Sequence, residues 1–164
     1  MIQIDLGLLL NLEMGKYNCL ILQQLFKQFM SRKIYLNLPV KDLKKSISFF
    51  TKLGFAFNPQ FTDENGTCMI VNDEVFVMLL LEKFFKSFID NEICDTTKST
   101  EVIVAMSVDS KTEVDDLVQK AITNGGKTHR QSIDHGWMMQ KSFYDLDGHI
   151  WEIFFMDVNA MPKN

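Results

Sequence analysis

An order of predicted elements that occurs twice along the chain constrains its fold more than any other feature. In the first copy, apolar and polar residues alternate over 34–38, which is the pattern of a strand with one buried face. Asp42 can cap the start of a helix, and Gly54 can end it. Three further strands are predicted in this copy, at residues 55–61, 67–71 and 75–81.

The second copy has the same order of elements. Alternation over 102–108 predicts a strand, and Ser110 with Glu113 forms the capping box that begins a helix. An Asn-Gly-Gly run at 124–126 ends this helix. Further strands are predicted at 127–131, 137–143 and 150–155, the last two joined by a turn at 145–148.

The repeated order predicts an α+β fold made of two βαβββ units in tandem. We expect a pseudo-twofold, incompletely closed barrel-like sheet with a central cavity, because each unit has a sheet face that its one helix leaves uncovered. A single domain over 30–160 would contain unit one at about 31–85, a polar linker at about 86–100 and unit two at about 101–157. The alternative is a ferredoxin-like α/β sandwich, which needs a different element order.

Composition limits the classes of partner. The chain has 164 residues, a net charge of -4 and no clustered basic excess, so we expect neither nucleic-acid nor membrane binding. No apolar run approaches the roughly 18 residues of a membrane-spanning helix. The three cysteines form no CxxC pair, which favours a reducing, cytoplasmic setting.

The first 29 residues stand apart from the repeat. Ile21, Leu25 and Phe29 follow helical spacing, so this N-terminal extension could form a short amphipathic helix. Alternatively the extension is not native, and translation begins at Met30.

A single acid interrupts the last predicted strand. Glu152 alternates with Ile150 and Phe154, so the three side chains share one face of an otherwise apolar segment. An isolated carboxylate in such surroundings is costly unless it is paired or binds a metal ion. Glu152 is therefore the first candidate for a functional residue, although an edge strand with Glu152 facing water is the plain alternative.

Two motifs resemble a known family. The stretch NLPVKDLKKSISFFTKLGF (37–55) is similar to the opening of a vicinal oxygen chelate unit, and SFYDLDGHIWEI (142–153) is similar to its closing hairpin. This is the glyoxalase, bleomycin-resistance and extradiol-dioxygenase superfamily, and the glyoxalase-related predicted lactoylglutathione lyases are the most similar in character. The resemblance implies a small-molecule ligand, a homodimer and a divalent metal (Ni, Zn, Mn or Fe) in the cavity.

The family's metal ligands lie on the first and last strand of each unit. Matched to this chain, these positions hold Tyr35, Ile103, Glu152 and, to within one or two residues, Val77. Only Glu152 carries a strong metal-binding group, and Val77 and Ile103 cannot coordinate a metal. We therefore expect an incomplete or absent metal site.

The resemblance leaves two functions open. One is a lyase or isomerase acting on a small carbonyl substrate, with Glu152 as metal ligand or as the base that removes a proton next to the carbonyl. The other is non-catalytic binding of a small molecule, similar to bleomycin-resistance proteins. The residues predicted to line the site with Glu152 are Tyr35, Asn37, His135, Trp137, Gln140 and Tyr144.

Overall fold

The computed structural model describes residues 32–162. The predicted extension at 1–29 lies outside this range. Within the described range, the structure contains no helix with the length and apolar character needed to cross a bilayer.

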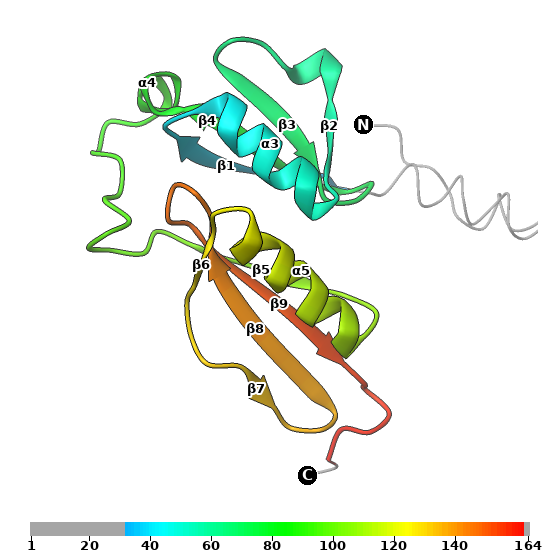
Figure 1. Cartoon of the computed structure of the whole chain (residues 1–164). Helices are drawn as coiled ribbons and strands as arrows, with labels where there is room; N and C mark the ends of the chain where they lie inside the picture. Colours follow the sequence, from blue (N-terminus) through cyan, green and yellow to red (C-terminus); the bar gives the residue numbers. More distant parts are fainter. Residues whose placement is uncertain (1–31, 163–164) are drawn as a thin grey trace, which may run out of the picture. The chain divides into compact units, whose positions relative to one another are not determined.

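The first half of the molecule contains one sheet and one long helix (Figure 1). The sheet has four strands in the order β1-β4-β3-β2, so the first strand pairs with the last. The elements are β1 Ile34–Val40, α3 Leu43–Leu53, β2 Ala56–Asn58, the 3-10 helix η1 Pro59–Phe61, β3 Gly66–Ile70, β4 Val75–Leu81, α4 Glu82–Phe85 and the 3-10 helix η2 Lys86–Phe88.

The ends of α3 follow from its sequence. The Asp42 side chain accepts a hydrogen bond from the Lys45 amide, 3.1 Å away, which satisfies one of the free N–H groups of the first turn. Gly54 ends the helix with a φ of 105°, a left-handed conformation that glycine adopts at little cost. The predicted cap and stop are both confirmed.

The second half repeats this layout with a five-stranded sheet. Its strands follow the order β5-β9-β8-β6, and β7 also pairs with β8. Strand β5 runs parallel to β9, and β8 forms an antiparallel hairpin with β9. The elements are β5 Ile103–Ser107, α5 Lys111–Thr123, β6 Lys127–Thr128, β7 Ile133–Asp134, β8 Met138–Tyr144 and β9 Ile150–Met156.

The capping box of α5 forms as predicted. The Glu113 amide donates to Ser110 Oγ over 3.1 Å, and the Glu113 carboxylate accepts the Asp109 amide at 3.0 Å. The two bonds fix where the helix begins, immediately after β5.

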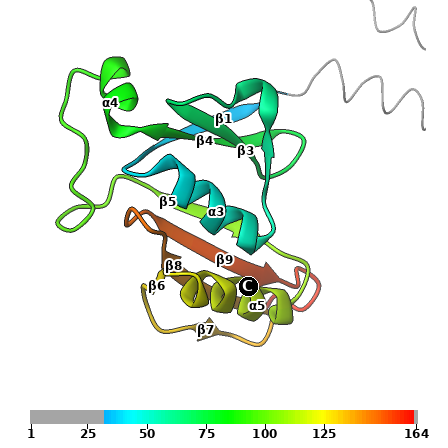
Figure 2. The ribbon, with the colours of Figure 1, turned by 45° about the horizontal axis from the view of Figure 1, so that its top comes forward.

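One hydrophobic core joins both helices to one side of each sheet. Figure 2 shows α3 between the first sheet and β9, and the Phe50 ring of α3 lies 5.0 Å from the Trp151 ring of β9. The Phe143 ring also stacks with the Trp151 ring, with centroids 6.4 Å apart. Buried members of the core include Leu38, Val40, Phe49, Phe50, Leu53, Val77, Leu79, Val114, Ala121, Phe143, Trp151 and Ile153.

The α+β class and the two βαβββ units are confirmed, and the ferredoxin-like alternative is excluded by the element order. The two sheets stay separate in the described range, so no continuous barrel forms. The strand predicted at 55–61 is shorter, because Pro59 has no amide to donate and starts a 3-10 turn. Helix α4, η2 and the two-residue β7 were not predicted.

Candidate functional site

Glu152 lies on the side of the second sheet that faces away from the helices. Its neighbours Trp151 and Ile153 are fully buried in the core, so strand alternation turns Glu152 the other way. Across the sheet, Glu152 pairs with Ala105 of β5 and with Ser142 of β8. We call this face, opposite the helices, the open side of the second sheet.

The Glu152 carboxylate has a neutral partner. The side-chain amide of Gln140, on the neighbouring strand, donates a hydrogen bond to Glu152 Oε2. Within residues 32–162, no lysine, arginine or histidine forms an ion pair with Glu152. The charge of the carboxylate is therefore not compensated by a cation of the described chain.

Three more polar side chains lie beside this pair. The Oγ of Ser142 is 3.1 Å from Nδ1 of His129, and Ser142 is only 6% exposed. The Tyr144 ring meets the His129 ring edge-on, with centroids 4.8 Å apart. Burial lowers the pKa of His129, the positive charge of Arg130 acts in the same direction, and the Glu152 carboxylate opposes them.

Apolar groups border the polar cluster. Ile103, on β5, is 49% exposed, and Phe154, two residues after Glu152, is half-buried. Ile150, two residues before Glu152, is buried. A few convergent polar groups among hydrocarbon surfaces are typical of small-molecule sites.

The structure brings two of the predicted site residues to Glu152. Gln140 and Tyr144 lie on β8 with the same parity as Ser142, so they share the open side. His135 and Trp137 lie at the far end of the hairpin, where their rings stack with centroids 6.3 Å apart. No hydrogen bond, ion pair or ring contact joins these two residues to Glu152 in the described part of the chain.

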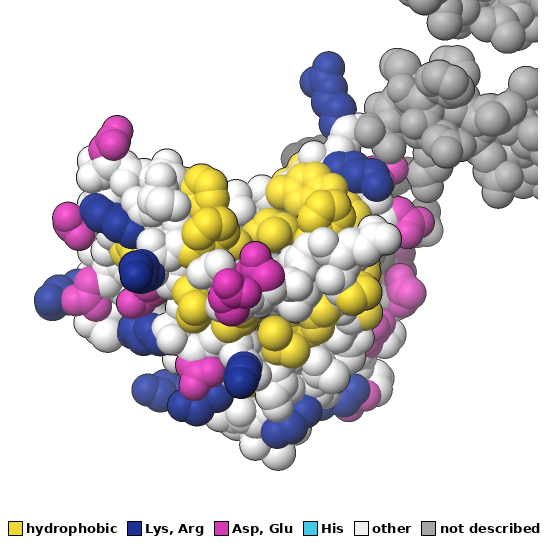
Figure 3. All heavy atoms as spheres, turned by 90° about the horizontal axis from the view of Figure 1, so that it is seen from above, with side chains coloured by type: hydrophobic (Ala, Val, Ile, Leu, Met, Phe, Trp, Pro, Cys, Tyr) yellow, Lys and Arg dark blue, Asp and Glu magenta, His cyan; other side chains and the backbone are white. Residues whose placement is uncertain are grey.

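Tyr35 and Asn37 belong to the other sheet. They alternate along β1 with the buried Leu38 and therefore face away from α3. Tyr35 is 49% exposed and stacks on Phe76 with centroids 4.9 Å apart. Figure 3 looks down from the top of Figure 1 and shows hydrophobic side chains over much of this view, with an acidic group among them and lysines and arginines towards its edge.

The residues at the family's ligand positions do not fit a metal ion. Val77 is 1% exposed and packs in the same core as α3, so it cannot face the side that Glu152 faces. The hairpin match to Val77 has an error of one or two residues, and the neighbouring positions that face away from the core are Phe76 and Met78. Neither supplies the imidazole or carboxylate ligand that the family's divalent metals take. Among residues 32–162, no three His, Cys, Asp or Glu side chains come together.

Sequence reasoning missed His129. This residue lies just after β6, and its amide donates to the Ser142 carbonyl at 3.3 Å. The antiparallel register pairs Lys127 with Tyr144 and Thr128 with Phe143, which extends to His129 beside Ser142. Extending the β6–β8 pairing by one residue would have placed His129 beside Ser142. The sequence pattern of the two-residue strand β6 is too weak, however, to predict how it is aligned with β8.

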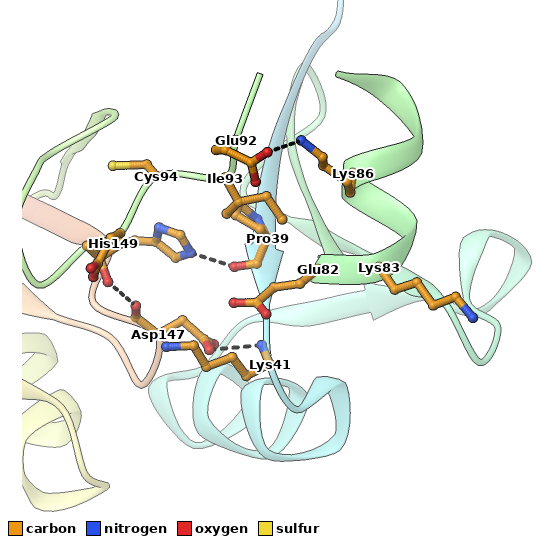
Figure 4. A pocket seen from close by; sticks show the side chains of 12 residues that line it. Pro39, Lys41, Glu82, Lys83, Lys86, Glu92, Ile93, Cys94, Asp147 and His149 are labelled. Atoms are coloured by element: carbon orange, nitrogen blue, oxygen red, sulfur yellow. Dashed lines mark hydrogen bonds and ion pairs between the residues drawn. The ribbon is translucent and has the colours of Figure 1, made fainter. Parts of the chain in front are cut away.

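The turn before β9 has a structural role. The Asp147 carboxylate accepts hydrogen bonds from the Lys41 amide at 2.9 Å and from Ser46 Oγ at 3.2 Å. The His149 ring donates from Nε2 to the Pro39 carbonyl over 2.8 Å. These bonds join the second half to β1 and α3 of the first half (Figure 4). The motif that resembles the family most closely thus holds the halves together.

A polar cavity of about 540 Å³ lies against this turn. Its charged walls are largely committed to the protein: Lys86 pairs with Glu92 at 3.2 Å, and both oxygens of Asp147 are bonded. His149 is 3% exposed, with Nδ1 2.8 Å from the Glu101 carboxylate but outside hydrogen-bond geometry. Glu152 is not among the residues that line this cavity.

Comparison with known proteins identifies the fold family. Residues 34–153 match the family model described as the Glyoxalase/Bleomycin resistance protein/Dioxygenase superfamily. No curated protein matches.

Solved structures show the same fold. A hypothetical protein from S. aureus has a TM-score of 0.66 and 28% identity, over 80% of this chain and 98% of its own. A glyoxalase-related enzyme from Fulvimarina pelagi has a TM-score of 0.64 and 22% identity, over 77% and 88%. The fosfomycin resistance protein FosX from Listeria monocytogenes has a TM-score of 0.57 and 16% identity, over 79% and 97%.

Proposed function

The chain belongs to the glyoxalase/bleomycin resistance protein/dioxygenase superfamily, and from this premise we propose that it binds a small molecule on the open side of the second sheet through Glu152. The observation that carries the proposal is the Glu152 carboxylate itself. It is half-buried, bonded to the Gln140 amide and not paired with any described cation. Such a group attracts a hydrogen-bond donor, and a cationic donor most strongly.

The surroundings narrow the class of ligand. Ile103 and Phe154 offer hydrocarbon surface on either side of the carboxylate. A molecule with an ammonium or hydroxyl group attached to an apolar part would use both features. Structures with this fold include proteins named for drug resistance, which supports a small organic ligand.

The side chains at the family's metal-ligand positions favour binding over the metal-dependent lyase reaction. Of the three positions where the family holds further ligands, Val77 and Ile103 carry hydrocarbon side chains and Tyr35 carries a phenol, a costly ligand because it must lose its proton to bind, so we derive no step through a metal ion. Lactoylglutathione lyase activity stays a prediction from the resemblance. Turnover of the glutathione hemithioacetal of methylglyoxal that is lost in Glu152→Gln would give Glu152 a catalytic role beyond binding.

A matched pair of probes tests the proposal. 2-Phenylethylamine and phenylacetate share a ring and a similar length but carry opposite charges. In a ¹H–¹⁵N NMR titration, the amine should shift the amide signals of Gln140, Ser142 and Glu152 in a saturable manner. Phenylacetate should bind at least about tenfold more weakly, because a charge-assisted hydrogen bond contributes about 1.5–3 kcal/mol.

Glu152→Gln keeps the shape of the side chain and removes its charge. We expect this variant to lose the preference for the amine, whereas Glu64→Gln, in an exposed turn of the first half, should keep it. Equal affinity for both probes in the native protein, or an unchanged preference in Glu152→Gln, would refute the proposed site.

A further inference from the structure

The polar groups on the open side form a line across β9, β8 and the residue that follows β6. Ser142 pairs directly with Glu152, and the His129 amide bonds to the Ser142 carbonyl on the other side. The His129 ring reaches back over Ser142, so its side chain lies on the same face as Glu152. A carboxylate, a hydroxyl and an imidazole therefore follow one another across the sheet.

The Ser142 hydroxyl determines which nitrogen of His129 is free. A buried hydroxyl needs an acceptor for its proton, and within residues 32–162 the only hydrogen-bond partner of Ser142 Oγ is His129 Nδ1. If Ser142 donates, Nδ1 accepts and the ring proton sits on Nε2. The imidazole is then a neutral donor, in keeping with the burial that lowers its pKa. The Tyr144 ring contact limits rotation of the imidazole.

We propose that His129 is a second binding group of this site, and that the ligand is a small amino-carbonyl or hydroxy-carbonyl compound. Its ammonium or hydroxyl group donates to Glu152, and its carbonyl oxygen accepts the Nε2 proton of His129. This inference rests on the proposed function and adds the acceptor end of the ligand.

The spacing of the strands sets the size range of such a ligand. Glu152 and His129 are two strands apart, and two steps of about 4.8 Å place their Cα atoms about 10 Å from each other. A donor and an acceptor on adjacent carbons are about 3 Å apart. With a hydrogen bond of about 2.9 Å at each end, such a ligand spans about 9 Å between the Glu152 carboxylate oxygen and His129 Nε2.

Two probes isolate the acceptor end. Phenylalaninamide is 2-phenylethylamine with a carboxamide added next to the amine, so it presents the same ring and ammonium plus one carbonyl. In NMR titrations of the full chain at pH 7.0, we expect phenylalaninamide to bind about tenfold more tightly than 2-phenylethylamine, which is the effect of one well-placed hydrogen bond of about 1.4 kcal/mol.

Variants of His129 separate recognition from a structural role. His129→Ala should abolish the advantage of phenylalaninamide and leave the affinity for 2-phenylethylamine within about twofold. His129→Gln, whose amide can still donate, should recover part of the advantage. If His129→Ala weakens both probes equally, His129 only supports the fold, and this inference is wrong.

The outcomes also distinguish the two proposals. If 2-phenylethylamine binds at the Glu152 signals and phenylalaninamide binds no more tightly, the role of His129 fails and the Glu152 site stands. If neither probe binds, both proposals fail.

Discussion

The two sheets of this molecule share a layout and differ in one of their sides. In each, the first strand pairs with the last, and the side that faces the helices is apolar and buried. The sides that face away from the helices have little in common. The first carries Tyr35, Phe76 and Met78, whereas the second carries Glu152, Ser142 and Gln140.

This difference assigns stability to the helix-facing sides of the sheets and ligand chemistry to one of the sides that face away from the helices. The helix-facing sides of both sheets supply the hydrophobic core, and neither copy can change there without cost. The other sides are under no such constraint, so the second sheet can gather polar groups there while the first carries mostly apolar and aromatic side chains. Each of the following experiments challenges that division.

The largest effects should come from the buried sides, and should be similar in the two sheets. We expect Trp151→Ala, in β9, to lower the free energy of unfolding by about 3–5 kcal/mol, and Leu79→Ala, in β4, by about 2–5 kcal/mol. Both side chains have no exposed surface, so truncation leaves a cavity. Urea denaturation measures both.

Phe61→Ala is the control for these truncations, because Phe61 is 57% exposed. Its effect should stay within about 0.5 kcal/mol. A loss below about 1 kcal/mol for either buried residue would show that one sheet is peripheral to the core, and the comparison would break down.

The hairpin turns offer a smaller, pH-dependent contrast. Asn72 Oδ1 accepts two backbone amides, each at 2.8 Å, in the first turn, and Asp145 Oδ1 accepts two, at 3.0 and 2.9 Å, in the second. Burial raises the pKa of the Asp145 carboxyl above its usual value, despite the opposing charge of His149. Folding therefore favours the protonated acid, and this contribution disappears as pH rises through the folded-state pKa.

Asp145→Asn makes the second turn resemble the first. At pH 4 we expect it to cost about 1 kcal/mol, because the Trp151 indole loses the acceptor that Asp145 Oδ2 provides at 3.0 Å. The cost should shrink towards pH 7. The wild-type protein loses the stability that a protonated Asp145 contributes, whereas the variant has no such contribution to lose. Unfolding curves at several pH values test this, with exposed Asn72→Asp as the control. A cost that grows with pH would contradict the raised pKa.

The smallest effect should be on the open side of the first sheet. Asn37 is exposed, and its side chain forms no hydrogen bond with any described residue. We expect Asn37→Ala to change the free energy of unfolding by less than about 0.5 kcal/mol and to leave binding of 2-phenylethylamine unchanged. Weaker binding of 2-phenylethylamine by this variant would show that the first sheet contributes to the site, which is the role predicted for Asn37 from the sequence.

Much of the fold could be predicted because its signals are local. The capping box at Ser110, the left-handed stop at Gly54 and the alternation in β4 and β9 each act within a few residues. The position of Glu152 opposite Trp151 follows from the same alternation.

The rest of the site depends on contacts between distant segments. His129 meets Ser142 only through the register of the short strand β6. The match to Val77 has an error of one or two residues, because comparing the lengths of two hairpins does not show which face each residue takes, and the structure buries Val77 in the core. The role of His149 in binding Pro39 could not be inferred from a turn motif alone.

The pairing of β5 with β9 has a consequence for synthesis. Ile103 lies beside Ile150, so this sheet is completed only when a segment almost 50 residues later along the chain arrives. Until then, β5 presents an unpaired edge, and such long-range closure is slow compared with the local β8–β9 hairpin. As the ribosome makes the chain from its N-terminus, the acid-bearing strand emerges after every other described strand. A nascent chain that ends before β9 therefore has neither a complete second sheet nor a binding site.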